Sequence, residues 1–208
     1  MGLKQSIIEQ FGKPTGNFGG FVGWLMSIKN KDRAEWTFEK LQLKTTDKLL
    51  EIGYGPGSTL KRVADNLTTG FVAGIDHSEV MFKQASNRNK KHIEGNKAKL
   101  ECGTVWDLEY SENYFDTIFG SNVHFFWKTS LDESKKLVSL LKPNGRLVMV
   151  FQPRWTSRAE IKSALIEDEI KQIADKTKKQ FEDVGLTNIE IDFKKIKPVT
   201  CIYISGQK

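Results

Sequence analysis

The sequence has few of the residues that cross-link a chain or interrupt its regular structure. Among its 208 residues are 2 cysteines and 5 prolines. The cysteines, Cys102 and Cys201, form no CxxC pair and lie in apolar runs, which predicts buried thiols in a reducing compartment rather than a disulfide framework. The composition as a whole excludes collagen, disulfide scaffolds, coiled coils and wholly disordered chains.

Long hydrophobic runs are also lacking. The most apolar N-terminal stretch, residues 18–28, has only eleven residues, whereas a helix that spans a bilayer needs about 20. The stretch has no basic segment before it and no small-residue cleavage site after it, so it does not resemble a signal peptide. We therefore expect a cytoplasmic protein with no membrane span.

What is present is the composition of a globular domain. Hydrophobic residues make up 38% of the chain, charged residues make up 28%, and the net charge is +6. A chain of this length removes roughly 70% of its extended surface from water, which is enough for a real core. No linker or repeat divides the chain, so one globular unit is expected. The mildly basic charge excludes neither a small-molecule enzyme nor a nucleic-acid binder.

Short apolar runs alternate with helical patterns. Strands are predicted at residues 48–53, 71–76, 98–103, 115–120, 146–151, 189–193 and 200–204, and helices at 58–66, after Ser78, at 131–141 and at 159–184. This alternation is typical of an α/β fold in which helices cover both faces of a parallel sheet. No helix separates the final two strands, so the last strand is expected to run antiparallel. Residues 1–40 are predicted to form an N-terminal helical cap, or lid, over the domain formed by residues 41–208.

The sharpest local signal is the glycine-rich loop that follows the first predicted strand. Residues 49–57 are LLEIGYGPG, with glycines at 53, 55 and 57. Glycines let the backbone turn tightly and approach a ligand, and the helix that follows offers free N–H groups. The dinucleotide pattern GxGxxG is not met, because Ser58 stands where its last glycine should be. An acidic residue on the strand, Glu51, would repel a pyrophosphate and attract a cationic ligand.

A second signal is Asp76, at the end of the second predicted strand. In an open α/β sheet, ligands bind beyond the carboxyl ends of the strands, and a carboxylate at this place can accept hydrogen bonds from both hydroxyls of a ribose. Together, the glycine loop, Glu51 and Asp76 indicate a nucleoside with a positively charged tail that is not a phosphate.

These motifs resemble those of class I S-adenosylmethionine-dependent methyltransferases, in particular the small-molecule branch typified by ubiquinone and menaquinone biosynthesis methyltransferases. The resemblance runs from about Leu49 to the C-terminus. It rests on the glycine loop, on GIDHS around Asp76, on YFDTIF at residues 114–119 and on LKPNGRL at residues 141–147. It implies a Rossmann-like, seven-stranded, mostly parallel sheet that binds S-adenosylmethionine and releases S-adenosylhomocysteine.

The resemblance also implies candidate cofactor residues. Glu51 would lie near the methionine amino group, and Asp76 would hold the ribose hydroxyls. The other candidates lie in the loops at the strand ends or beside the adenine (Gly53, Tyr54, Gly55, Gly57, His77, Met81, Thr104, Val105, Ser121 and Asn122). For Met81, a place in the core is an equal alternative.

The adenine end departs from the pattern of the family. Many relatives have Gly-Asp-Ala after the third strand, with the aspartate bound to the adenine amino group. This chain has Gly103, Thr104 and Val105 there. The Thr104 hydroxyl can still accept one hydrogen bond, and Asp107, three residues further on, is an alternative that the sequence leaves open.

The segment after the fourth strand, residues 120–127, is expected to border the transferred methyl group. It contains His124, which could act as a general base because the unperturbed pKa of histidine is about 6.5. The alternative is that His124 packs among the aromatic residues that follow it. No histidines or cysteines have metal-ligand spacing, so no catalytic metal is expected. Residues 18–24 could form a mobile lid, an interfacial membrane contact or a fixed helix.

The predicted function is therefore methyl transfer from S-adenosylmethionine to a small-molecule acceptor by in-line displacement. The acceptor and the oligomeric state stay open. An RNA or protein methyltransferase is a rival, but acidic residues interleave the basic stretch between residues 171 and 197, as on a solvated helix face, so nucleic acid is not the expected partner. A second rival binds the same cofactor without methyl transfer. A nicotinamide oxidoreductase is disfavoured by Ser58 and Glu51.

Overall fold

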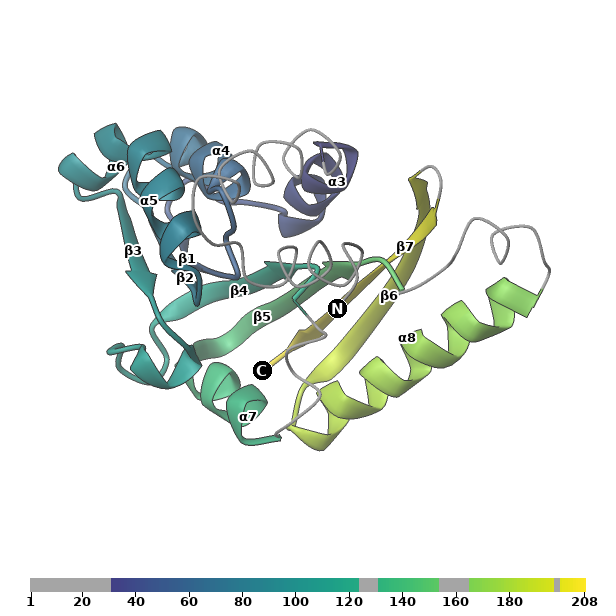
Figure 1. Ribbon diagram of the computed structural model, residues 1–208. Coiled ribbons are helices and arrows are strands. Elements are labelled where there is room, and N and C mark those ends of the chain that lie inside the picture. Colours follow the sequence, from purple (N-terminus) through teal and green to yellow (C-terminus); the bar gives the residue numbers. More distant parts are fainter. Residues whose placement is uncertain (1–30, 124–130, 154–164, 197–198) are drawn as a thin grey trace, which may run out of the picture.

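A seven-stranded sheet in the order β3-β2-β1-β4-β5-β7-β6 forms the centre of the molecule, and helices cover both of its faces (Figure 1). The computed structural model describes residues 31–123, 131–153, 165–196 and 199–208. The strands are β1 (Lys48–Ile52), β2 (Phe71–Asp76), β3 (Ala98–Cys102), β4 (Phe115–Ser121), β5 (Leu141–Phe151), β6 (Thr187–Ile196) and β7 (Val199–Gln207). The helices in the described ranges are α3 (Lys31–Leu41), α4 (Ser58–Asn66), α5 (Glu79–Arg88), α6 (Lys90–Glu94), the short 3-10 helix η1 (Val105–Asp107), α7 (Leu131–Leu140) and α8 (Leu165–Asp183).

The strand order determines which edge of the sheet can bind a ligand. β1 pairs in parallel with β2 on one side and with β4 on the other. β3 adds to β2 and β5 adds to β4, also in parallel, whereas β7 runs antiparallel between β5 and β6. The mostly parallel α/β sheet and the antiparallel last strand are therefore confirmed. The order reverses between β1 and β4, which is where open α/β sheets bind ligands.

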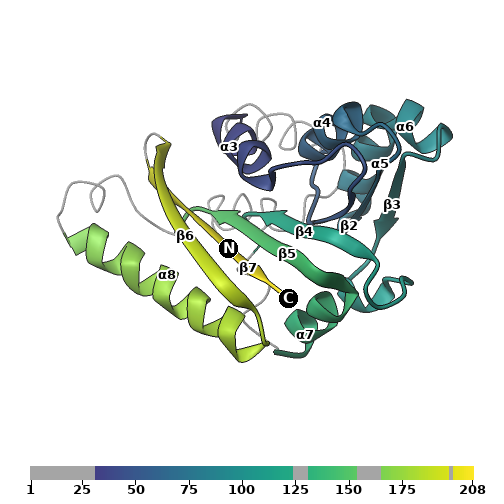
Figure 2. The same ribbon diagram turned by 180° about the vertical axis from the view of Figure 1, so that it is seen from behind.

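Two hydrophobic layers hold the helices against the sheet. α3, α4 and α5 lie on one face and α7 and α8 on the other, as opposite views show (Figures 1 and 2). Successive residues of β1 serve both layers: Leu49 packs in the layer with Leu60 of α4, and Leu50 in the layer with Leu137 of α7. Because both faces are covered, buried apolar residues follow one another along the strand instead of alternating with exposed polar ones.

The boundaries of β5 differ from the prediction. The strand begins at Leu141 rather than at residue 146, because the Lys-Pro-Asn-Gly turn is kept inside it as a bulge. Asn144 has a φ of 65° there, and the pairing with β4 shifts between Phe115 and Thr117. The sequence thus predicts the turn, but not that the chain pairs with β4 both before and after it.

The prediction that both cysteines are buried is wrong for Cys102. Cys201 is buried on β7, but Cys102 is exposed at the end of β3. β3 is an edge strand with neighbours on one side only, so an apolar run there does not guarantee burial on both faces.

The predicted N-terminal cap is described only from residue 31. In this part, α3 lies against α4, β4 and β5. Trp36 of α3 packs near Tyr203 of β7, with ring centroids 6.3 Å apart. The predicted lid at residues 18–24 lies outside the described residues, as does the first part of the predicted helix at 159–184. No described helix is long and apolar enough to cross a membrane.

Candidate functional site

Most of the predicted site residues lie at one edge of the sheet, where the parallel strands end. The glycine loop follows β1, Asp76 ends β2, Thr104 follows β3 and Ser121 ends β4. Because these strands lie side by side in parallel, their carboxyl ends meet at this edge. The predicted base, His124, lies outside the described residues.

The glycine loop between β1 and α4 contains three left-handed residues. Gly53, Gly55 and Gly57 have φ of +65°, +53° and +74°, in a region that glycine adopts without strain. The amide of Gly53 donates to the carbonyl of Ile75 on β2 (2.7 Å). Among the described residues, a Cβ atom built on Gly55 would have no neighbour within 4 Å. The loop is therefore fixed at its start and open at Gly55, where a ligand can approach the backbone.

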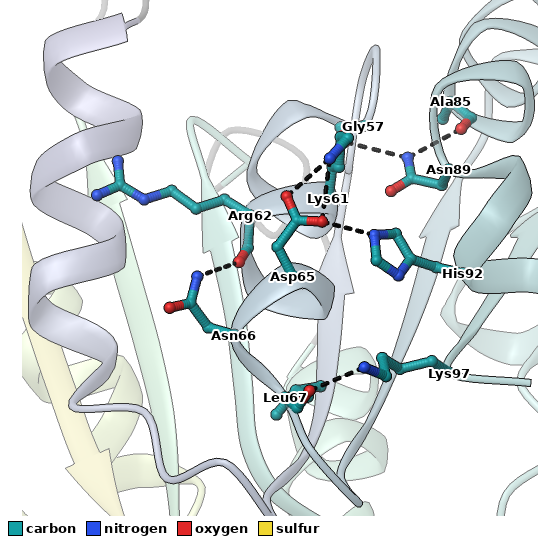
Figure 3. Close-up of polar contacts among 10 residues, drawn as sticks. All are labelled: Gly57, Lys61, Arg62, Asp65, Asn66, Leu67, Ala85, Asn89, His92 and Lys97. Atoms are coloured by element: carbon teal, nitrogen blue, oxygen red, sulfur yellow. Dashed lines mark hydrogen bonds and ion pairs between the residues drawn. The ribbon is translucent and has the colours of Figure 1, made fainter. Parts of the chain in front are cut away.

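The end of the loop is fastened by the junction of α5 and α6 (Figure 3). Asn89 is fully buried, and its Nδ2 donates to the carbonyl oxygens of Gly57 (3.1 Å) and Ala85 (2.9 Å). A Cβ atom on Gly57 would lie 2.7 Å from Nδ2 of Asn89 and 2.8 Å from Cβ of Ala85, so a larger residue would force the two apart. Arg88 donates to the hydroxyl of Ser58 at the start of α4. Asn89 is not predicted from the sequence, because no local pattern marks a contact across 32 residues.

Further polar contacts hold α4 to α6 (Figure 3). Asp65 accepts a hydrogen bond from Nζ of Lys61 (2.7 Å) and lies 2.8 Å from Nε2 of His92. Partial burial tends to raise the pKa of Asp65, but the hydrogen bonds from Lys61 and His92 outweigh it and lower this pKa. Lys97 donates to the carbonyl of Leu67 at the end of α4 (2.9 Å). These contacts keep α4, and the loop at its N-terminus, in place beside α5 and α6.

The carboxylate of Asp76 is tied to the glycine loop. Oδ2 accepts from the amide of Gly55 (2.8 Å), and Oδ1 accepts from the amide of Ser78 (2.9 Å). The side chain is only 8% exposed, so two backbone amides fix its orientation beside the open position of the loop. His77 is more exposed, and its Nδ1 lies 3.8 Å from Oδ1 of Asp76.

Glu51 is a buried carboxylate with an unsatisfied oxygen. It is 3% exposed, and its Oε2 has no hydrogen-bond partner among the described residues. Burial, and then the charge of Asp76, raise the pKa of Glu51 well above its usual range, while the amide of Leu60 opposes the shift. A buried charge without a partner is costly, so this site favours a protonated carboxyl or a cationic ligand.

Tyr54 and Met81 contribute their side chains to the core. Each is 3% exposed and packs in the layer formed with α3, α4 and α5. The Tyr54 hydroxyl donates to the carbonyl of Glu101 on β3 (3.0 Å), and burial raises the pKa of Tyr54. Met81 is thus part of the core, and its place beside the adenine stays a prediction.

At the end of β3, Asp107 folds back onto Thr104. The amide and the hydroxyl of Thr104 both donate to Oδ2 of Asp107, at 2.7 and 2.8 Å. These two bonds lower the pKa of the exposed Asp107, and the bond from the amide contributes most. The hydroxyl of Thr104 keeps its acceptor capacity. Val105 is buried, whereas Trp106 presents an aromatic side chain that is 57% exposed.

At the end of β4, Ser121 and Asn122 connect to β5 and α3. The amide of Asn122 donates to the carbonyl of Val150 (2.9 Å), and its Oδ1 accepts from the amide of Gln152 (3.0 Å). Oγ of Ser121 accepts from Nε of Arg33 on α3 (3.3 Å). Arg33, like Asn89, is not predicted from the sequence, since its partner Ser121 is 88 positions away.

Comparisons with known proteins agree with this arrangement. Residues 49–145 match the family described as methyltransferase domain. The chain is 26% identical over 187 residues to the uncharacterized methyltransferase YdaC of Bacillus subtilis, a match that covers 90% of this chain and 97% of that protein. A phosphoethanolamine N-methyltransferase of Haemonchus contortus, solved with S-adenosyl-L-methionine, superimposes with a TM-score of 0.70 at 14% identity. The chain is therefore similar, in sequence and in fold, to class I S-adenosylmethionine-dependent methyltransferases.

The match to the Haemonchus contortus enzyme covers 93% of this chain and 57% of that one, so this chain spans little more than half of that enzyme's length. A second solved complex of that enzyme holds phosphomonomethylethanolamine and S-adenosylhomocysteine. The demethylmenaquinone methyltransferase of Oceanobacillus iheyensis is 26% identical over 126 residues, which is 59% of this chain and 51% of that protein.

S-Adenosylmethionine is the cofactor of the methyltransferase domain, and the residues at the sheet edge fit it. The cofactor has a cationic amino group, and Glu51 has a buried oxygen without a described partner. Gly55 has open space beside its backbone, and the carboxylate of Asp76 lies at its amide. In the described ranges, no group of three or more His, Cys, Asp and Glu side chains could hold a metal ion.

Proposed function

We propose that this methyltransferase domain transfers the methyl group of S-adenosylmethionine to a small-molecule acceptor by in-line displacement. The observation that carries the proposal is the pair of carboxylates at the glycine loop: Glu51, buried with an unpartnered oxygen, and Asp76, held at the amide of Gly55. The names of two similar enzymes, demethylmenaquinone methyltransferase and phosphoethanolamine N-methyltransferase, indicate small acceptors, and this supports the same class of acceptor here.

The proposed cofactor contacts follow from these positions. Glu51 binds the amino group of the methionine part, and Asp76 binds the ribose hydroxyls. The backbone of the glycine loop lies along the methionine and ribose, with the remaining contacts from the other strand ends (Gly53, Tyr54, Gly55, Gly57, His77, Met81, Thr104, Val105, Ser121 and Asn122). For Tyr54 and Met81, whose side chains are buried, the contribution is a supporting wall.

The chain itself acts mainly by positioning. Bound S-adenosylmethionine supplies an electrophilic methyl group, so the protein has to orient the acceptor in line with it and exclude water. Asp76 is suited to orienting the ribose of the cofactor, because two backbone amides already fix its own carboxylate. We propose that residues 1–40, 121–129 and 152–155 cover the side of the site to which the acceptor binds.

For acceptors that carry a proton on the nucleophile, we propose that His124 removes it. A general base typically contributes 10²–10⁴-fold to the rate. His124→Ala should therefore lower turnover about 10²-fold or more while the affinity for S-adenosylhomocysteine stays unchanged. A smaller loss at full cofactor affinity would leave His124 without this role.

The first experiment is a thermal-shift panel with S-adenosylmethionine, S-adenosylhomocysteine, NAD and NADP. A ligand at ~100 times its dissociation constant adds about 2.7 kcal/mol of stability, which raises the melting temperature of a chain of this size by roughly 5–10 °C. Stabilisation by the first two ligands alone is expected. Stabilisation by the dinucleotides alone would overturn the proposal. Formation of S-adenosylhomocysteine with small acceptors, but not with RNA or protein, separates the proposal from its rivals.

A further inference from the structure

Arg33 is a buried guanidinium at the ends of β4 and β5, beside the candidate site. It lies on α3, which packs against β4 and β5, and it is only 4% exposed. Its Nε donates to Oγ of Ser121 at the end of β4 (3.3 Å), and its Nη1 donates to Oε1 of Gln152 just after β5 (3.0 Å). Arg33 therefore reaches the carboxyl ends of the two strands that lie on the far side of β1 from Asp76.

The described contacts of Arg33 are all with neutral groups. Ser121 and Gln152 carry no charge, and the third neighbour is the thiol of Cys201. Burial raises the pKa of Cys201, and Arg33 offsets only part of this effect, so the thiol is protonated at neutral pH. Burial also lowers the pKa of Arg33 itself, but a guanidinium keeps its proton in proteins.

Other cations around α3 are paired with carboxylates. Lys40 lies 2.6 Å from Asp192, and Arg62 lies 2.8 Å from Glu35. Within the described ranges, no carboxylate forms an ion pair with Arg33, although Arg33 is more buried than Lys40 or Arg62. Burial of a charge without a counter-charge is costly, so retaining this one implies a negative group that the chain's described residues do not supply.

The guanidinium also has donors to spare. Ser121 and Gln152 take one donor each, and the planar fork of arginine has further N–H groups that match the two oxygens of a carboxylate or phosphate. The neutral hydroxyl and amide hold the fork in a fixed orientation without neutralising it. Arg33 is thus a cation in a fixed position, with N–H groups left to bind an anion.

We propose that Arg33 is the anchor of an oxyanion subsite at the ends of β4 and β5, which binds a carboxylate or phosphate group of a ligand. The inference rests on the proposed function for the identity of that ligand. The oxyanion has two sources in a methyl-transfer complex: the carboxylate of the cofactor's methionine part, or an acidic group on the acceptor. Ser121 ends β4 and Gln152 follows β5, on the other side of β1 from Asp76. Under the proposed function, in which Asp76 binds the ribose, the methionine part and the acceptor extend from β2 toward these two strand ends.

The test separates the two sources by calorimetry with S-adenosylhomocysteine and with 5′-methylthioadenosine, which lacks the amino-acid part. The variants are Arg33→Gln, Arg33→Lys, which keeps the charge but loses the fork, and Arg62→Gln as a matched arginine control on α4. If Arg33 binds the cofactor carboxylate, Arg33→Gln weakens S-adenosylhomocysteine at least tenfold and leaves 5′-methylthioadenosine unchanged.

If the oxyanion belongs to the acceptor, both nucleosides bind Arg33→Gln as tightly as the wild type. Inorganic phosphate, at constant ionic strength, then raises the melting temperature of the wild-type complex with S-adenosylhomocysteine but not that of the Arg33→Gln complex. The Arg62→Gln control responds as the wild type does in both arms. Should Arg33→Gln fail to fold, Arg33→Lys gives the same comparison with the buried charge retained.

The subsite is overturned if cofactor affinity is unchanged and phosphate, sulfate and acetate act equally on the wild-type and Arg33→Gln proteins. Arg33 would then only connect α3 to the sheet. If the proposed function is wrong, the wild type itself binds neither S-adenosylhomocysteine nor 5′-methylthioadenosine. The effect of phosphate on the melting temperature is then still measured, on the wild-type and Arg33→Gln proteins without cofactor.

Discussion

Two carboxylates at the glycine loop have opposite environments. Both oxygens of Asp76 accept backbone N–H bonds, from Gly55 and Ser78. Glu51 has an oxygen without a described partner and a pKa raised by burial and by Asp76. Asp76 is therefore arranged to accept hydrogen bonds, whereas Glu51 becomes favourably ionised when a cation is nearby.

Removing the Asp76 carboxylate tests its role in cofactor binding. Asp76→Ala should weaken S-adenosylhomocysteine about 10- to 100-fold, because a hydrogen bond to a charged group contributes roughly 1.5–3 kcal/mol. Isothermal titration calorimetry measures the change, with Asp175→Ala on the exposed face of α8 as the matched control. Equal affinities of Asp76→Ala and wild type would remove Asp76 from the cofactor site.

Glu51 should make the ligand-free protein sensitive to pH. Its folded pKa is raised above the usual value of 4.5, so the folded chain holds a proton that the unfolded chain has lost. The stability that this proton gives is complete below the unfolded pKa, and it is lost as the pH rises through the folded pKa. Glu51→Gln should abolish this loss. In urea unfolding, the free energy of unfolding of the variant relative to that of the wild type should therefore rise with pH.

The same variant should bind S-adenosylhomocysteine more weakly, because a neutral amide replaces the partner of the amino group. A variant that is destabilised equally at every pH would contradict the account of Glu51 as a buried, raised carboxyl.

At the scale of elements, the junction of α5 and α6 controls the shape of the glycine loop. Asn89 fastens Gly57 to Ala85, and it is the residue that ends one helix and precedes the next. The loop is thus held from two directions: by β2 at Gly53 and by this junction at Gly57.

Asn89→Ala should lower both stability and cofactor affinity. The substitution leaves two buried carbonyls without this donor, at a cost of about 1–3 kcal/mol. It also frees the end of the loop, so the dissociation constant of S-adenosylhomocysteine should rise. Asn87→Ala is the control, since Asn87 is exposed on the same helix. A stability loss with unchanged affinity would limit Asn89 to a structural role.

The elements that could be predicted are those whose signals are local. β1 and β2 are apolar runs, Ser78 caps α5, and glycines and Asp76 mark the strand ends, so the sheet and much of the site edge follow from the sequence. α6 was missed because its five residues, KKHIE, have no apolar period. Asn89 and Arg33 were missed for another reason: both act on residues distant in sequence, and only the folded chain brings those partners together.

At the scale of the whole molecule, the two ends of the sheet have different tasks. The carboxyl ends of the strands hold the candidate site. At the opposite end, Asp116 of β4 accepts from the amide of Lys48 (2.8 Å) on β1 and from Nζ of Lys142 (2.7 Å) on β5. Burial tends to raise the pKa of Asp116, but the hydrogen bonds from Lys142 and Lys48 outweigh it and lower this pKa. This carboxylate therefore joins three adjacent strands.

Asp116→Asn should destabilise the fold without affecting the site. Because the folded pKa lies below the unfolded one, the stabilisation is present above the unfolded pKa and is lost as the pH falls through the folded pKa. Near neutral pH the loss should be about 1–2 kcal/mol, given the partial exposure of the pair, or roughly 3–6 °C in melting temperature. Asp175→Asn should melt like wild type. A change in S-adenosylhomocysteine affinity would contradict the separation of the two ends.

The placement of β7 has a consequence for folding. β7 follows β6 in the sequence, yet it lies between β5 and β6, and in the described part of the chain β6 pairs with no strand other than β7. Until β7 has inserted, the strands from β3 to β5 can pair with one another, but β6 has no strand to join and β5 has an open edge. Unpaired edges of this kind attract other chains. Insertion of the nine-residue β7 is thus the step that closes the sheet and protects the folding chain from association.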